Sequence, residues 1–179
     1  MSVLTGPAPW KIRDRTLSWG SRTYLMGVLN VTPDSFSDGG QFDTLERAVA
    51  QARHLVHHGT DILDIGGQST RPGAGSVSRE EELNRVIPVI NAIRADEDDL
   101  LAQAIISVDT TRSSVARAAV RAGADIVNDI SAGTYDKGML STVADLGVPI
   151  VIMHLRGTPA TMQQYTDYHD LVGEIYDFL

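Results

Sequence analysis

The chain has 179 residues, of which 42% are hydrophobic and 21% charged, and its formal net charge is −8. This length suits one domain, 1–179, with a buried core, and the lack of a basic tract argues against binding to nucleic acid. The absence of cysteine excludes disulfides and thiolate metal sites. Because neither a secretory signal nor a long apolar run is visible, we expect a cytoplasmic protein that does not enter a membrane.

The predicted elements begin with a short β-hairpin, in which residues 16–19 and 22–25 flank a Gly20-Ser21 turn. Five short runs rich in Ile and Val follow, and they lack the polar alternation of a half-exposed strand. That pattern is typical of parallel strands covered on their outer face. The five predicted strands are 24–30, 61–65, 105–109, 125–129 and 148–154.

Helical patterns lie between these strands. Asp43 followed by Glu46, and Ser78 followed by Glu81, resemble capping boxes and predict helix starts. Pro88 interrupts the second pattern and is expected to bend that helix. The later helical segments are 113–122, ended by Gly123, 137–146, ended by Gly147, and 167–179. Strand and helix thus alternate five times, which predicts an α/β fold with a parallel sheet.

Polar residues end each apolar run. In a parallel barrel all strands point the same way, so these groups would gather at the mouth that carries the chemistry. Each also has an ordinary explanation. Asp109 could cap the next helix, and His154 is equally well explained as a buried core residue. The residues concerned are Asn30, 66–71, Asp109, Asn128-Asp129 and His154.

Two loops carry an unusual density of functional groups. Residues 30–40 form a long connection with two carboxylates and a Gly-Gly ending, a composition typical of a lid. Residues 66–73 combine glycines, hydroxyls and Arg71, which suits a diphosphate. This second loop is not a P-loop, because the Gly-Lys-Ser/Thr ending is absent.

These segments resemble the dihydropteroate synthases of the pterin-binding family. MGVLNVTPDSFSDGG at 26–40 is similar to the first signature of that family, and DIGGQSTRPG at 64–73 to the second, with Gln68 where many relatives have Glu. The three short matches that follow in order are Ser107-Val108-Asp109-Thr110, Asn128-Asp129-Ile130 and Met153-His154. The resemblance implies a TIM-type (β/α)8 barrel, of which about the first five βα units are present.

The resemblance also implies an activity, in which 6-hydroxymethyl-7,8-dihydropterin diphosphate is joined to p-aminobenzoate with release of diphosphate, in folate biosynthesis. Such enzymes are the sulfonamide target, and full-length members are expected to be homodimers. By resemblance, Asn30 would hold Mg²⁺, and Asp38, with Asp34, would be catalytic by stabilising a pterin cation. The ordinary explanation for Asp38 is a turn before Gly39-Gly40. The implied substrate-binding residues are Thr70 and Arg71 for diphosphate, Asp109, Asn128 and Met153 for the pterin, and Phe36, Ser69 and Pro72, with Asp38, for p-aminobenzoate.

A complete barrel of this type takes about 250 residues, and the later Asp-Pro-Gly, Ser-Arg-Lys and Arg-x-His motifs of the family are not found in the sequence. We therefore expect an N-terminal part of the barrel with two unpaired sheet edges and little or no synthase activity alone. Two alternatives stay open. One is a non-catalytic pterin-binding relative or fragment that acts with a partner chain. The other is a pterin-binding methyltransferase, which shares the strand-end Asp and Asn but not the two loops.

Overall fold

A computed structural model of the chain describes residues 7–32, 41–68 and 77–179. Its centre is a parallel five-stranded sheet whose strands follow one another in sequence order. The strands are β3 (Met26–Asn30), β4 (Ile62–Gly66), β5 (Ile105–Asp109), β6 (Ile126–Asp129) and β7 (Ile150–Ile152). The helices are α1 (Gln41–His57), α2 (Arg79–Arg94), α3 (Asp99–Ala102), α4 (Ser113–Ala122), α5 (Met139–Leu146) and α6 (Leu171–Phe178), with a 3₁₀ turn at Met162–Gln164. The predicted alternation of strand and helix is confirmed.

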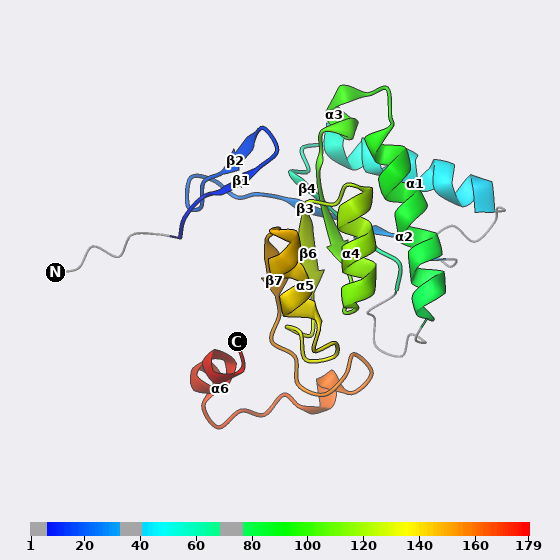
Figure 1. Ribbon diagram of the computed structural model, residues 1–179. Helices are drawn as coiled ribbons and strands as arrows, with labels where there is room; N and C mark the ends of the chain where they lie inside the picture. Colours follow the sequence, from blue (N-terminus) through cyan, green and yellow to red (C-terminus); the bar gives the residue numbers. More distant parts are fainter. Residues whose placement is uncertain (1–6, 33–40, 69–76) are drawn as a thin grey trace.

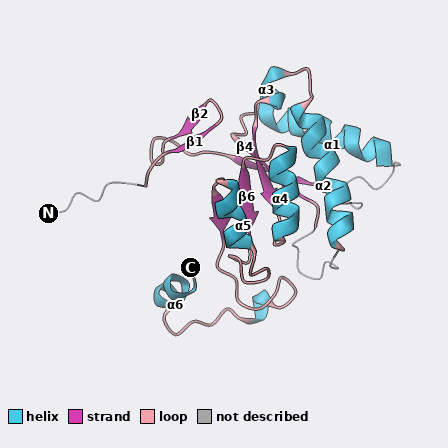
Figure 2. Ribbon diagram, viewed as in Figure 1, coloured by secondary structure: helices cyan, strands magenta, loops and turns pink. Residues whose placement is uncertain are grey.

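One face of the sheet is covered by α1, α2, α4 and α5 (Figures 1 and 2). Leu63 and Ile65 of β4, and Ile106 and Val108 of β5, are fully buried in this layer. Each such side chain contributes about 1.5–3 kcal/mol by leaving water. Because β4 is buried along its whole length, its sequence shows a continuous apolar run rather than alternation.

The opposite face is covered at its amino-terminal end by a hairpin of β1 (Trp10–Ile12) and β2 (Arg15–Leu17). Its Ile12 and Leu17 pack against Ile62, Ile105 and Ile126. The hairpin therefore covers the amino-terminal end of this face and does not cover its carboxyl end. The hairpin and α6 both lie on the side of the sheet away from the helix layer (Figure 1).

The predicted position of the hairpin was wrong. A turn does form at Gly20, which has φ +83°, and the Ser21 N–H closes it by donating to Ser18 O at 3.2 Å. The Ser18 N–H donates to the Tyr24 hydroxyl at 2.8 Å rather than to a partner strand. Trp19 packs edge-on against Trp10 and Tyr24. The paired strands lie earlier in the chain, because that register turns apolar side chains toward the sheet.

Helix ends follow the local sequence closely. Ser78 caps α2 as predicted and accepts from the Glu81 N–H at 3.1 Å. Gly123 (φ +119°) and Gly147 (φ +66°) end α4 and α5 in the left-handed conformation. One detail differs, since α1 begins two residues before Asp43. Pro88 lies inside α2, which continues to Arg94.

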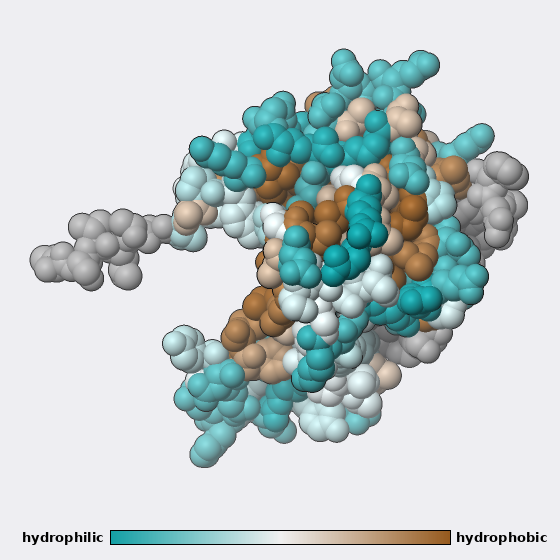
Figure 3. Space-filling model, viewed as in Figure 1, coloured by the Kyte–Doolittle hydropathy of each residue, from teal (hydrophilic) through white to brown (hydrophobic). Residues whose placement is uncertain are grey.

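The two edges of the sheet carry exposed apolar side chains. Within the described residues, β3 pairs only with β4 and β7 only with β6, as predicted. Val28 on β3 is 59% exposed, and Met153, just after β7, is 39% exposed. Figure 3 shows hydrophobic surface lining the hollow between the hairpin and α6. No helix in the described part of the chain is both long and apolar enough for a membrane crossing.

Candidate functional site

The carboxyl ends of four strands place one residue each in a single row. Asn30, Gly66, Asp109 and Asn128 are register partners across β3, β4, β5 and β6. Residues of one row share a face of the sheet, and here it is the face away from the helices, since the preceding residues of these strands belong to the helix-covered core. The structure thus brings together three of the side chains that the sequence singled out.

Gly66 allows two of these side chains to approach each other. A Cβ atom built on Gly66 would lie 3.4 Å from Asp109 Oδ2 and 3.7 Å from Asn30 Oδ1. The two oxygen atoms therefore converge over the glycine, in space that a side chain would fill. Carboxylate and amide oxygens are ligands that Mg²⁺ accepts, and this ion usually keeps several waters and takes few protein ligands beside substrate phosphates. The donor set therefore fits the magnesium site expected at Asn30.

A second row of polar groups lies two residues deeper. Asp64 and Ser107 are register partners, with exposures of 5% and 0%. The Asn128 side-chain amide donates to Asp64 Oδ2 at 3.0 Å. Asp64 Oδ1 and Ser107 Oγ are both buried and make no other hydrogen bond among the described residues, and the Ser107 hydroxyl lowers the pKa of Asp64 as a hydrogen bond to the carboxylate does. Buried polar atoms are rarely left unpaired, and these two neighbours across β4 and β5 are the partners available to each other.

Carboxyl groups crowd this end of the sheet. Burial, and then the nearby charges of Asp64, Glu82 and Asp129, raise the pKa of Asp109 to about 7. Burial also raises the pKa of Asp64, although the neighbouring Ser107 and Asn128 side chains offset part of this rise. Near neutral pH, Asp109 can therefore either donate or accept a hydrogen bond.

The structure tests the ordinary, non-catalytic explanations for several strand-end residues. Asp109 does not cap α4, because Asp136 Oδ2 accepts from the Ser113 N–H at 2.8 Å instead. Asp129 is a turn residue, since its carboxylate accepts from the Ser131 N–H, the Ser131 hydroxyl and the Gly133 N–H. The ring of His154 packs at 4.9 Å, edge to face, against Phe178, but His154 is only partly buried, so it is not the buried core residue of the ordinary explanation.

Seven predicted site residues lie outside the described parts of the chain: Asp34, Phe36, Asp38, Ser69, Thr70, Arg71 and Pro72. Met153 is described and follows β7, where its N–H donates to Asp129 O at 3.3 Å.

Four residues near the strand ends were given no role from the sequence: Asp64, Ser107, Glu82 and Arg112. Asp64 had a visible signal, a carboxylate within an otherwise apolar strand. Glu82 and Arg112 had none, because they resemble ordinary helix-surface charges until the fold pairs them.

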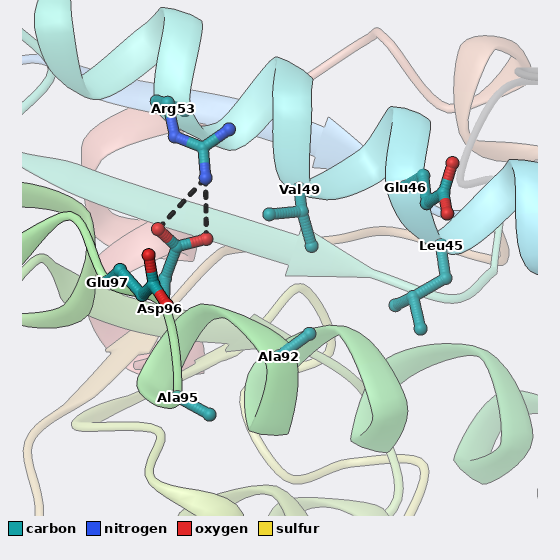
Figure 4. A pocket seen from close by; sticks show the side chains of 8 residues that line it. All are labelled: Leu45, Glu46, Val49, Arg53, Ala92, Ala95, Asp96 and Glu97. Carbon is teal, nitrogen blue, oxygen red and sulfur yellow. Dashed lines mark hydrogen bonds and ion pairs between the residues drawn. The ribbon is translucent and has the colours of Figure 1, made fainter.

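A groove of about 530 Å³ lies elsewhere, between α1 and α2 (Figure 4). Leu45, Val49 and Ala92 contribute to its lining, with the ion pair of Arg53 and Asp96 at 2.7 Å. None of the strand-end residues lines it, so it is separate from the site described above.

Comparison with known proteins agrees with this geometry. Residues 26–179 match the model of a family described as "Pterin binding enzyme". The chain is 53% identical over 172 residues to dihydropteroate synthase from Synechocystis sp., which covers 96% of this chain and 58% of that protein. A crystal structure of Yersinia pestis dihydropteroate synthase with a sulfonamide drug complex superposes with a TM-score of 0.81 at 42% identity, covering 96% of this chain and 60% of the other.

A Xanthomonas albilineans dihydropteroate synthase with 4-aminobenzoic acid gives a TM-score of 0.74 at 49% identity, covering 88% of this chain and 54% of the other. The five parallel strands and the hairpin thus correspond to part of a dihydropteroate synthase barrel. The chain spans somewhat more than half the length of these relatives. It belongs to the pterin binding enzyme family, in the part of that family represented by the dihydropteroate synthases.

Proposed function

We propose that the strand-end residues form the pterin-binding part of a dihydropteroate synthase site. The observation that carries the proposal is the set of acceptors formed by Asp109 and Asn128, with Asp64 beneath them. A pterin ring presents amino and ring N–H groups along one edge, and these need acceptors. One N–H of the Asn128 amide is used on Asp64, which orients the amide so that its carbonyl oxygen can accept from the ligand. Burial of the row strengthens each such hydrogen bond.

The proposed reaction joins the pterin diphosphate to p-aminobenzoate. The bond between the exocyclic pterin carbon and the diphosphate oxygen breaks, and its electron pair leaves with diphosphate. The amine nitrogen of p-aminobenzoate then bonds to that carbon and releases a proton to solvent. Asp109 and Asn128 hold the ring during this exchange. By resemblance, Asp38, with Asp34, stabilises the cationic carbon in a site that excludes water.

The remaining roles follow the same resemblance. Asn30 would hold Mg²⁺, which when bound would neutralise the diphosphate. Thr70 and Arg71 would contact the diphosphate, Met153 would pack near the pterin ring, and the p-aminobenzoate subsite would comprise Phe36, Asp38, Ser69 and Pro72. Binding of 4-aminobenzoic acid and of a sulfonamide by the relatives supports this assignment. A homodimeric, cytoplasmic full-length protein completes the proposal.

We further propose that the 179-residue chain binds pterin but turns over little substrate by itself. The relatives are longer by about two fifths of their length, and a barrel site is built from the loops of all its strands. Purified chain supplied with both substrates and Mg²⁺ should form dihydropteroate far more slowly than a full-length synthase. Comparable turnover would contradict this part of the proposal.

Calorimetry with 6-hydroxymethylpterin tests the pterin site directly. The chain should bind it, and Asn128→Ala should weaken binding by about tenfold to a hundredfold, because it removes one acceptor and leaves Asp64 unpaired. Asp177→Asn, an exposed position on α6, serves as the control and should bind like the wild type. Binding that Asn128→Ala leaves unchanged, or no binding by the wild type, would overturn the proposal.

A further inference from the structure

The first turn of α2 places a carboxylate where no solvent reaches it. Glu82 is 1% exposed. Its Oε1 accepts from the Thr110 hydroxyl at 2.5 Å, and its Oε2 is paired with the Arg112 guanidinium. A buried ion pair of this kind is often no more stabilising than apolar residues of the same shape. Stability alone therefore does not account for the pair of Glu82 and Arg112.

The Arg112 side chain connects segments that lie far apart in the sequence. Its second terminal nitrogen donates to Val77 O at 2.7 Å, just before α2. Its first terminal nitrogen also reaches Gln68 Oε1 at 3.4 Å, just after β4. The Arg112 N–H donates to Thr110 Oγ1 at 3.2 Å, and Thr110 directly follows Asp109. One guanidinium thus joins the carboxyl ends of β4 and β5.

Packing beneath this junction leaves little freedom. A Cβ atom on Gly67 would lie 2.9 Å from Val86 Cγ2 and 3.2 Å from the Glu82 backbone oxygen. Arg85 adds a hydrogen bond of 2.8 Å to Gly67 O. The start of α2 is therefore pressed directly onto the end of β4, and Glu82 faces the end of β5 from this fixed position.

We propose that Glu82 and Arg112 are positioning residues, which fix the ends of β4 and β5 relative to each other and so hold Asp109 in its place over Gly66. A planar guanidinium suits this task because it can bond several acceptors in fixed directions, whereas a lysine ammonium cannot. The effect on ligand binding rests on the pterin site proposed above. The effect on the two strand ends does not depend on the identity of the ligand.

Two readouts separate positioning from stability. The first is hydrogen exchange at the Glu81 and Glu82 amides, which donate to Ser78. Ser78 directly follows Val77, whose carbonyl oxygen accepts from Arg112. The second is the calorimetric affinity for 6-hydroxymethylpterin. Arg112→Lys should accelerate exchange and weaken binding by about tenfold each, because a hydrogen bond to a charged group is lost. Arg117→Gln, on the side of α4 that contacts Thr142 and Asp145 of α5, is the matched control and should change neither readout.

The double variant Glu82→Met with Arg112→Met decides between the two roles. Removing both charges together should keep the melting temperature near that of the wild type, while exchange stays fast and affinity stays low. Wild-type exchange and affinity in the double variant, or in Arg112→Lys, would overturn the proposal. If the wild-type chain binds no pterin, the proposed function fails, whereas exchange in the two variants still decides the positioning role.

Discussion

Replacing Asp109 with asparagine should stabilise the folded chain, and more strongly as the pH rises. The carboxyl has a pKa of about 7 in the folded chain, against its ordinary value of 3.8. Between these values the folded state binds more protons than the unfolded state, so the free energy of unfolding falls as the pH increases. Asparagine fills the same space and stays neutral, so the variant avoids this loss.

The size of the effect follows from the pKa difference of Asp109. At about 1.36 kcal/mol per pKa unit, the ionised carboxyl costs the fold at most roughly 4 kcal/mol above pH 7 and little below pH 4. From pH 5 to pH 8 the advantage of the variant can therefore grow by no more than about 2.7 kcal/mol. Because the carboxyl is partly exposed, water lowers the expected growth to about 1–2 kcal/mol.

Urea unfolding at pH 5, 6, 7 and 8 measures this growth. Wild type and Asp109→Asn are compared with Asp177→Asn, whose carboxyl is exposed on α6. The control should show the same difference from wild type at each pH. An advantage of Asp109→Asn that is constant or shrinks toward pH 8 would refute the reasoning. The same variant should bind pterin more weakly, which would mean that the site is kept at some expense of stability.

Three further substitutions test the packing. Arg94→Ala should lower the free energy of unfolding by about 3–5 kcal/mol in urea titrations, because the guanidinium bonds three backbone carbonyls and Asp125. A loss below about 1 kcal/mol would contradict this. Gly67→Ala should cost about 1–3 kcal/mol by forcing Val86 aside, and an unchanged thermal midpoint would count against it. Arg22→Ala removes an ion pair whose arginine is half exposed and should leave the urea midpoint close to that of the wild type, because water screens exposed charges. A clear drop in the midpoint would contradict this.

Local sequence was sufficient for the five strands of the sheet and for several helix ends. The apolar runs predicted all five strands to within two residues at either end. For β4 and β5 the reason is that strands buried on both faces need such runs. Ser78, Gly123 and Gly147 placed the helix ends, because capping depends on neighbouring residues. The hairpin failed, since Gly20-Ser21 gives a turn signal whose strand pairing is settled by packing against the sheet.

The site depended on both levels. The two signature loops and the strand-end Asp109 and Asn128 were visible in the sequence, and so was the family. Adjacent residues such as Asn128 and Asp129 looked equivalent there. The pleat of β6 points the Asn128 side chain toward the site, whereas the Asp129 carboxylate accepts the hydrogen bonds of a turn. This difference depends on the register of the sheet.

The sequence by itself determined the order of strands and helices and the family, because both rest on local patterns and motifs. Only the tertiary structure decided which polar residues meet. Asn128 bonds Asp64 from 64 residues away, and Arg112 pairs with Glu82 from 30 residues away. Such pairs form because parallel strands bring all their carboxyl ends to one edge, and no local pattern records which side chains become neighbours there.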